Sequence, residues 1–156
     1  MKARDPSTPL EILLVEDNPG DVRLIEEIMK ESGMPIRLNV VRDGVEAMAF
    51  LRQEGPYTHV ATPNLIVLDL NLPRKNGHEV IAEVKEDLGL RRIPVVVLTG
   101  SEAEEDINRA YDLHANCCII KPFNLDQFIR VVRQMQEFWL TVAKLPGERG
   151  TGEGKG

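Results

Sequence analysis

The sequence LIVLD at Leu65–Asp69 is a short, continuous apolar run that ends in a carboxylate. Strands that are buried on both faces have this pattern, whereas strands with one wet face alternate between apolar and polar residues. Four further runs of the same kind lie at Leu10–Val15, Ile36–Val41, Ile93–Leu98 and Cys117–Ile120. Together the five runs predict the strands of a parallel sheet.

Signals for helix starts lie between these runs. The candidate N-cap residues are Asn18, Asp43, Asn76, Ser101 and Asn124. The residue three positions after each of them is acidic or a glutamine, as in a capping box. Alternating strands and helices predict an α/β fold in three layers. We expect a doubly wound, five-stranded parallel sheet in the flavodoxin-like order 2-1-3-4-5.

The length of 156 residues suits one domain. We expect a flexible N-terminus over residues 1–8, a folded domain over residues 9–145 and a disordered Gly-rich tail over residues 146–156. The net charge of -6 disfavours nucleic acid as the main partner. The sequence contains neither an apolar run of the ~20 residues that span a bilayer nor a secretory signal. The adjacent Cys117 and Cys118 would point to opposite faces of a strand, and we interpret them as reduced thiols of a cytoplasmic protein.

Residues that carry chemistry follow the predicted strands. Glu16 and Asp17 follow the first strand, Asp69 the third, Thr99 the fourth and Lys121 the fifth. Ligands of such sheets bind beyond the carboxyl ends of the strands, where the central strands bring their end residues together. Crowded carboxylates repel unless a cation cancels their charge. Mg²⁺, which prefers oxygen ligands, is the common choice.

This set of residues suits phosphoryl transfer. A carboxylate can attack a phosphoryl group and form an aspartyl phosphate, while a metal ion and a lysine neutralise the phosphoryl oxygens. Asp69 is central and is the candidate nucleophile, whereas Glu16 and Asp17 are candidate acids on the metal side. Taken alone, each acid could be a helix cap or a loop residue. The complete set in strand order favours a site.

At these residues the chain resembles the receiver domain of bacterial and archaeal two-component response regulators. The resemblance rests on the motifs ILLVEDN, LIVLDLNLP, GHEV, VVVLTGS and IIKPF, and it covers roughly residues 10–140. It implies that Asp69 accepts a phosphoryl group from a histidine kinase in a phosphorelay. It also implies that the Thr99 hydroxyl moves toward the phosphoryl group and that Lys121 pairs with a phosphoryl oxygen.

The resemblance further implies a Mg²⁺ site. Asp17 and Asp69 would bind the ion directly, together with the backbone carbonyl of Asn71. Glu16 would act through a bound water. The family often has Asp at the position of Glu16, but the longer side chain still reaches a metal-bound water.

Further features are similar to those of small regulators paired with phytochrome-type sensor kinases. They are the long connection before the third strand, the stretch Leu72–Gly77 and the segment Phe138–Leu140. One position departs from the family. Cys118 lies three residues before the lysine, where the family usually has an aromatic residue that swings during signalling. A thiol cannot move as a bulky ring does, so signalling through such a ring is in doubt.

This regulator would pass on its signal through a surface that another protein recognises. Thirteen residues follow Ala143, too few for an output domain. We therefore expect a single-domain regulator that catalyses only its own phosphorylation and dephosphorylation. Phosphorylation would shift a pre-existing equilibrium, and an unknown downstream protein would recognise the altered surface.

The last predicted helix has two apolar stripes. The first can face the sheet and consists of Leu125, Phe128, Ile129, Val132, Trp139 and Ala143. The second has the spacing of a coiled-coil seam and consists of Val131, Met135, Phe138, Val142 and Leu145. We expect a homodimer through this second stripe. The alternatives are a core helix with a wide apolar face and a face on which a kinase docks.

Two other classes of protein compete with this interpretation. A phosphatase with an aspartate nucleophile would also use Asp, Thr and Lys, but it usually carries a second Asp where this chain has Asn71. A flavin- or nucleotide-binding module needs a loop after the first strand that cradles phosphate. The loop at Glu16 to Pro19 is acidic and would repel phosphate.

Overall fold

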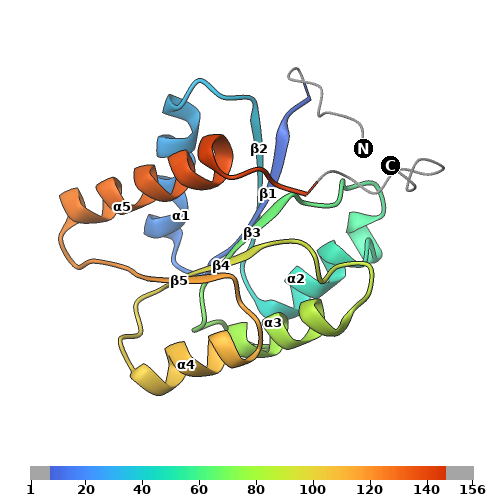
Figure 1. The fold of residues 1–156 in the computed structure, drawn as a ribbon. Coiled ribbons are helices and arrows are strands. Elements are labelled where there is room, and N and C mark those ends of the chain that lie inside the picture. The colour runs from blue at the N-terminus through green and yellow to red at the C-terminus, as the bar shows by residue number, and fades with distance from the viewer. Residues whose placement is uncertain (1–7, 147–156) are drawn as a thin grey trace.

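The computed structural model describes residues 8–146 and contains one parallel sheet (Figure 1). Apart from Thr8 and Pro146, the predicted flexible N-terminus and the Gly-rich tail lie outside the described residues. The strand order is β2-β1-β3-β4-β5, which confirms the predicted topology. The strands are β1 (Leu10–Val15), β2 (Ile36–Val41), β3 (Leu65–Leu68), β4 (Val95–Thr99) and β5 (Cys117–Ile120).

Four of these strands have the predicted bounds, whereas β4 runs from Val95 to Thr99 and not from Ile93 to Leu98. Pro94 explains the later start, because proline has no N–H to donate to a neighbouring strand. Its carbonyl still accepts a hydrogen bond from the backbone N–H of Ile66, at 3.0 Å. The strand therefore starts directly after the proline.

The helices cover both faces of the sheet (Figure 1). Helices α1 (Pro19–Glu31) and α5 (Leu125–Glu137) pack on one face. Helices α2 (Gly44–Leu51), α3 (Gly77–Glu86) and α4 (Glu104–Asp112) pack on the other. The long connection before β3 contains a 3-10 turn, η1 (Gly55–Tyr57). In residues 8–146, the helices are too short or too polar to cross a membrane.

Each face of the sheet has its own apolar core. Strands β1, β3 and β4 contribute alternate residues to the two cores, because successive side chains of a strand point to opposite faces. The free thiols of Cys117 and Cys118 follow the same rule and pack against different cores, as predicted. The outer strands β2 and β5 are mostly half-buried, since each has a neighbour on one side only.

Four of the five predicted N-caps form. The side chains of Asn18, Asp43, Asn76 and Asn124 each accept a hydrogen bond from the backbone N–H three residues on. The prediction for Ser101 is wrong, because α4 begins at Glu104 and its N-cap position is Ala103. The Ser101 hydroxyl instead donates to the carboxylate of Asp106, at 2.7 Å.

The two predicted stripes of the last helix need correction. Leu125 is exposed although it was assigned to the sheet, and Met135 is only 4% exposed although it was assigned to the dimer seam. After Glu137 the backbone continues as a π-helical turn, η2 (Phe138–Val142), which breaks the regular spacing. Leu140 is therefore buried, and Trp139 packs against the same core but is only partly buried. Phe138 and Val142 are the exposed members of the seam.

Candidate functional site

The ends of β1 and β3 bring two carboxylates together. Val15 pairs with Leu68 in the sheet register, so Glu16 and Asp69 follow neighbouring strand ends. The backbone N–H of Asp69 donates to the carbonyl of Val15 at 3.0 Å, which fixes the chain at this point. Both side chains are largely buried, and Glu16 is only 2% exposed. Of the three acids that the sequence predicts to share this pocket, Glu16 and Asp69 therefore lie together at one edge of the sheet.

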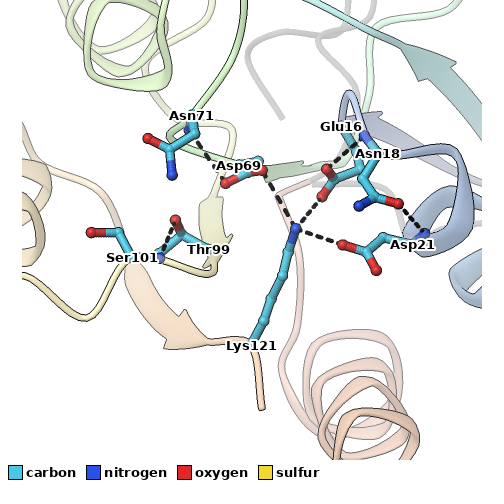
Figure 2. Close-up of polar contacts among 8 residues, drawn as sticks. All are labelled: Glu16, Asn18, Asp21, Asp69, Asn71, Thr99, Ser101 and Lys121. Atoms are coloured by element: carbon cyan, nitrogen blue, oxygen red, sulfur yellow. Dashed lines mark hydrogen bonds and ion pairs between the residues drawn. The ribbon is translucent and has the colours of Figure 1, made fainter. Parts of the chain in front are cut away.

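Lys121 extends from the end of β5 into the space between the carboxylates (Figure 2). Its Nζ donates to Glu16 Oε1 at 2.7 Å and lies 3.4 Å from Asp69 Oδ2. Its backbone N–H donates to the Thr99 carbonyl at 2.7 Å, which ties the end of β5 to that of β4. The ammonium therefore lies directly beside the candidate nucleophile.

Asp21 is a member of this cluster that the sequence analysis missed. Its Oδ2 accepts a hydrogen bond from Lys121 Nζ at 2.9 Å (Figure 2). In the sequence, Asp21 fits the helix-capping pattern, because it lies three residues after Asn18. A signal was present, because the helix after β1 begins at the edge of the sheet where the strand-end residues meet, and an acid in its first turn can reach that edge.

Thr99 and Asn71 lie on the side of Asp69 away from Glu16 (Figure 2). The Thr99 side chain is fully buried, and its Oγ1 accepts a hydrogen bond from the Ser101 backbone N–H at 3.2 Å. The backbone N–H of Asn71 donates to Asp69 Oδ1 at 3.3 Å. The two oxygens of Asp69 thus face different groups, one Asn71 and the other Lys121.

Asp17 is exposed in the loop between β1 and α1. The preceding Glu16 is held from two directions, because its Oε2 also accepts a hydrogen bond from the Asn18 backbone N–H at 3.1 Å. Glu16 is therefore a fixed part of the pocket wall, whereas Asp17, the other acid predicted on the metal side, is exposed.

The electrostatics show that the pocket is short of positive charge. Burial raises the pKa of Glu16 above its ordinary value of 4.5, and the charge of Asp69 adds to this, although the hydrogen bond from Lys121 opposes it. Burial alone would lower the pKa of Lys121. The hydrogen bonds to Glu16 and Asp21 and the charges of Asp69 and Glu16 outweigh burial and raise the Lys121 pKa. The ammonium is therefore charged at neutral pH.

The donor chemistry fits a hard divalent cation. Three carboxylates around one ammonium leave a charge of -3 + 1 = -2, and all the available donors are oxygens, which suit Mg²⁺ or Mn²⁺. Within residues 8–146, no three Asp, Glu, His or Cys side chains converge as a ready metal centre. Coordination here would thus need backbone carbonyls and water as well as carboxylates.

A glycine allows α3 to approach the site closely. A Cβ atom on Gly77 would lie 2.5 Å from the backbone oxygen of Asp69 and 2.6 Å from the Cα of Leu70. The Gly77 N–H donates to the Leu70 carbonyl at 2.9 Å. The start of α3 therefore packs directly on the backbone that carries the candidate nucleophile.

A groove leads from the surface to Lys121. Its volume is about 740 Å³, and residues of α1 and of the β5–α5 connection line it, including Asp21 and Lys121. Its rim is apolar, because Phe123 is 98% exposed and Leu125 is also exposed. An apolar surface beside a charged pocket offers a partner protein a place to bind next to the site.

Comparison with known proteins gives consistent matches. Residues 12–133 match the model of the response regulator receiver domain. The response regulator Rcp1 of Synechocystis is 48% identical over 91% of this chain and 97% of its own length. The crystal structure of the phosphorylated cyanobacterial phytochrome response regulator RcpA superposes with a TM-score of 0.87 at 54% identity, covering 90% of this chain and all of RcpA. The crystal structure of the Mn(2+)-bound form of Rcp1 also superposes with a TM-score of 0.87, at 49% identity, covering 89% of this chain and all of that structure.

Proposed function

Because the chain belongs to the response regulator receiver domain family, we propose that Asp69 is the residue that accepts the phosphoryl group. A receiver domain is a signalling switch and not an enzyme that turns over a substrate. The observation that carries the assignment is the position of Asp69, buried at the end of β3 with one carboxylate oxygen 3.4 Å from Lys121 Nζ. The family match does not support the phosphatase alternative.

This geometry supports the following transfer step. An oxygen of the Asp69 carboxylate attacks phosphorus and forms a P–O bond. The bond between phosphorus and the nitrogen of the donor histidine breaks, and its electron pair stays on the imidazole. Lys121 moves its long hydrogen bond from Asp69 to a phosphoryl oxygen and stabilises the charge there.

The divalent cation of this proposal is Mg²⁺. Asp17, Asp69 and the Asn71 carbonyl would bind it, and Glu16 would act through water. The bound ion would neutralise charge on the phosphoryl oxygens. Two observations support the site: the excess negative charge around Lys121 and the existence of a Mn(2+)-bound form of the similar Rcp1.

The signal would leave the site through α4. Thr99 Oγ1 accepts a hydrogen bond from the Ser101 N–H, and the Ser101 hydroxyl donates to Asp106 in the first turn of α4. A Thr99 hydroxyl that turns toward a phosphoryl group would disturb this chain and move the start of the helix. At Cys118, where the family usually has its mobile aromatic residue, the backbone N–H donates to the hydroxyl of Tyr111 in α4.

The phosphoryl donor of this proposal is a sensor histidine kinase of the phytochrome type. Similarity to RcpA, a phytochrome response regulator, supports this choice. The groove beside Lys121, with the exposed Phe123 and Leu125, offers the kinase a binding surface within reach of the acceptor. Recognition by a downstream protein and a location in the cytoplasm remain predictions from the sequence.

We further propose a homodimer through the end of the last helix. The full seam predicted from the sequence is not exposed, but Phe138 and Val142 are, and they lie within η2. Exposed large apolar side chains in a small patch are typical of contact surfaces. The proposed dimer is therefore centred on η2 and not on a coiled coil along α5.

The acceptor assignment is tested with acetyl phosphate and Mg²⁺ as donor and cofactor. The intact protein should gain about 80 Da, the mass of one phosphoryl group. The gain should disappear in Asp69→Asn and persist in the control Asp112→Asn, which changes an exposed acid at the end of α4. A phosphorylated Asp69→Asn variant would contradict the assignment.

A further inference from the structure

The ammonium of Lys121 has three N–H donors, and the structure provides a carboxylate for each of them. The distances from Nζ are 2.7 Å to Glu16 Oε1, 2.9 Å to Asp21 Oδ2 and 3.4 Å to Asp69 Oδ2. The two shorter bonds therefore go to residues other than the acceptor. Glu16 and Asp21 together determine where the ammonium lies.

The position of Asp21 is itself fixed by the start of α1. Its backbone N–H donates to the side chain of Asn18 at 3.1 Å, and Pro19 begins the helix. The Asp21 side chain is mostly buried against the pocket. A carboxylate on a capped helix is a firmer anchor for a flexible lysine than an acid on a loop, because less conformational freedom is lost when the bond forms.

We propose that Asp21 is a positioning residue for phosphoryl transfer at Asp69 and acts through Lys121. This inference rests on the proposed function of Asp69. Asp21 and Glu16 hold two donors of the ammonium in the resting and the phosphorylated states. The third donor, whose bond is the longest, passes from Asp69 to a phosphoryl oxygen.

The groove offers the Lys121 side chain a second position that it could occupy if Asp21 did not hold it. Lys121 and Asp21 both line the groove of about 740 Å³ that opens to the surface. If the Asp21 charge is removed, the four-carbon stem of Lys121 can turn toward this space, where water solvates the ammonium. The lysine would then spend less time beside Asp69, and transfer would slow.

Asp21 could instead act only on α1, because a carboxylate in the first turn of a helix interacts favourably with the helix dipole. Such a role would change the stability of α1 but would not depend on Lys121. A double-mutant cycle between the two residues separates the roles, since it measures whether the effect of one substitution requires the other residue.

The test uses the full chain at saturating Mg²⁺ and measures the rate constant of phosphorylation by acetyl phosphate. Asp21→Asn should slow the reaction about tenfold, or about 1.4 kcal/mol, the size of one charge-assisted hydrogen bond. Asp21→Glu keeps the charge and should restore the rate to within about threefold of wild type. The control Asp126→Asn removes an exposed acid from the first turn of α5 and should stay within about twofold.

In a Lys121→Met background, Asp21→Asn should cause no further decrease. A wild-type rate for Asp21→Asn, or an equal decrease with and without Lys121, would overturn the proposal. If wild type gained no phosphoryl group, the proposed function and this inference would both fail. If wild type were phosphorylated on Asp69 and Asp21→Asn reacted at the same rate, this inference alone would fail.

A second measurement needs no phosphoryl donor. Nitrogen-15 NMR detects lysine ammonium groups whose protons exchange slowly because they are hydrogen-bonded and shielded from water. The Lys121 signal should be visible in wild type and Asp21→Glu and should be lost in Asp21→Asn. An unchanged signal in Asp21→Asn would overturn the proposal, because Asp21 would then not hold the ammonium.

Discussion

Lys121 determines the character of the site at the scale of the residue. A lysine that is buried among carboxylates compensates part of their charge and stays protonated, since its pKa is raised by its partners. The pKa of Glu16 is also raised, by burial and by the charge of Asp69, and this favours the neutral form of its carboxyl group. The pocket therefore holds more negative charge than Lys121 neutralises, which is the property that attracts a cation. A bound cation would in turn offset the repulsion between these carboxylates and an anionic phosphoryl group.

A pH dependence of stability follows from Glu16. Its folded-state pKa is raised, so the folded state binds more protons than the unfolded state in the window that begins near 4.5. Without metal, the Glu16 contribution to the free energy of unfolding should therefore decrease as pH rises through this window. Glu16→Gln should remove the decrease, as measured by urea unfolding at several pH values. Parallel curves for wild type and Glu16→Gln would contradict the prediction.

The sequence predicted the residues that follow strands, and it missed the one that lies on a helix. Glu16, Asp69 and Lys121 were found because strand ends meet at one edge of a parallel sheet. Asp21 could not be assigned in the same way, because its role depends on the direction in which the first turn of α1 points. Only the structure shows that this direction is toward Lys121.

At the scale of the element, the site depends on how closely α3 approaches β3. Gly77 begins α3 and lies against the backbone of Asp69 and Leu70. The cap formed by Asn76 and Glu79 holds the helix start in place, because each side chain bonds to the backbone of the other residue. The N-terminus of α3 therefore packs against the backbone of Asp69 and limits where the acceptor can lie.

Gly77→Ala should disturb this support. The new Cβ would meet backbone atoms, which cannot move aside as a side chain can. We expect a loss of about 1–3 kcal/mol in the free energy of unfolding and slower phosphorylation of Asp69. The control is Gly89→Ala, whose nearest contact is a side-chain oxygen of Asp87 at 3.3 Å. Equal stability of the two variants, measured by urea unfolding, would contradict this account.

Helix starts were predictable where an Asn or Asp side chain accepts a hydrogen bond from the backbone N–H three residues on. Asn18, Asp43, Asn76 and Asn124 cap helices as expected. Ser101 fits the same pattern in the sequence, but its hydroxyl bonds to Asp106 and the helix begins later. Sequence spacing cannot distinguish a capping bond from a bond to Asp106, because either gives the Ser101 hydroxyl a hydrogen-bond partner.

At the scale of the whole molecule, the fold was predictable because the apolar runs are continuous and the helix signals separate them. The strand order is the flavodoxin-like order expected for a doubly wound sheet of five strands. The dimer seam was not predictable, because the change from α-helix to π-helical turn at Phe138 alters which side chains face outward. The remaining exposed residues of the seam are Phe138 and Val142.

The proposed dimer can be tested by sedimentation at high protein concentration with Mg²⁺ and the phosphoryl mimic beryllofluoride. Wild type should sediment as a dimer, and Phe138→Glu as a monomer, because a charge in an apolar contact is costly. Leu88→Glu changes an exposed apolar residue outside the patch and should remain dimeric. A monomeric wild type under these conditions would rule out the dimer.

The most direct test of the central claim is a crystal structure with Mg²⁺ and beryllofluoride bound. The account predicts beryllium on a carboxylate oxygen of Asp69, a fluorine within hydrogen-bond distance of Lys121 Nζ, and a metal ion shared by Asp17 and Asp69. Beryllium on another residue, or Asp17 and Asp69 too far apart to share the ion, would contradict it.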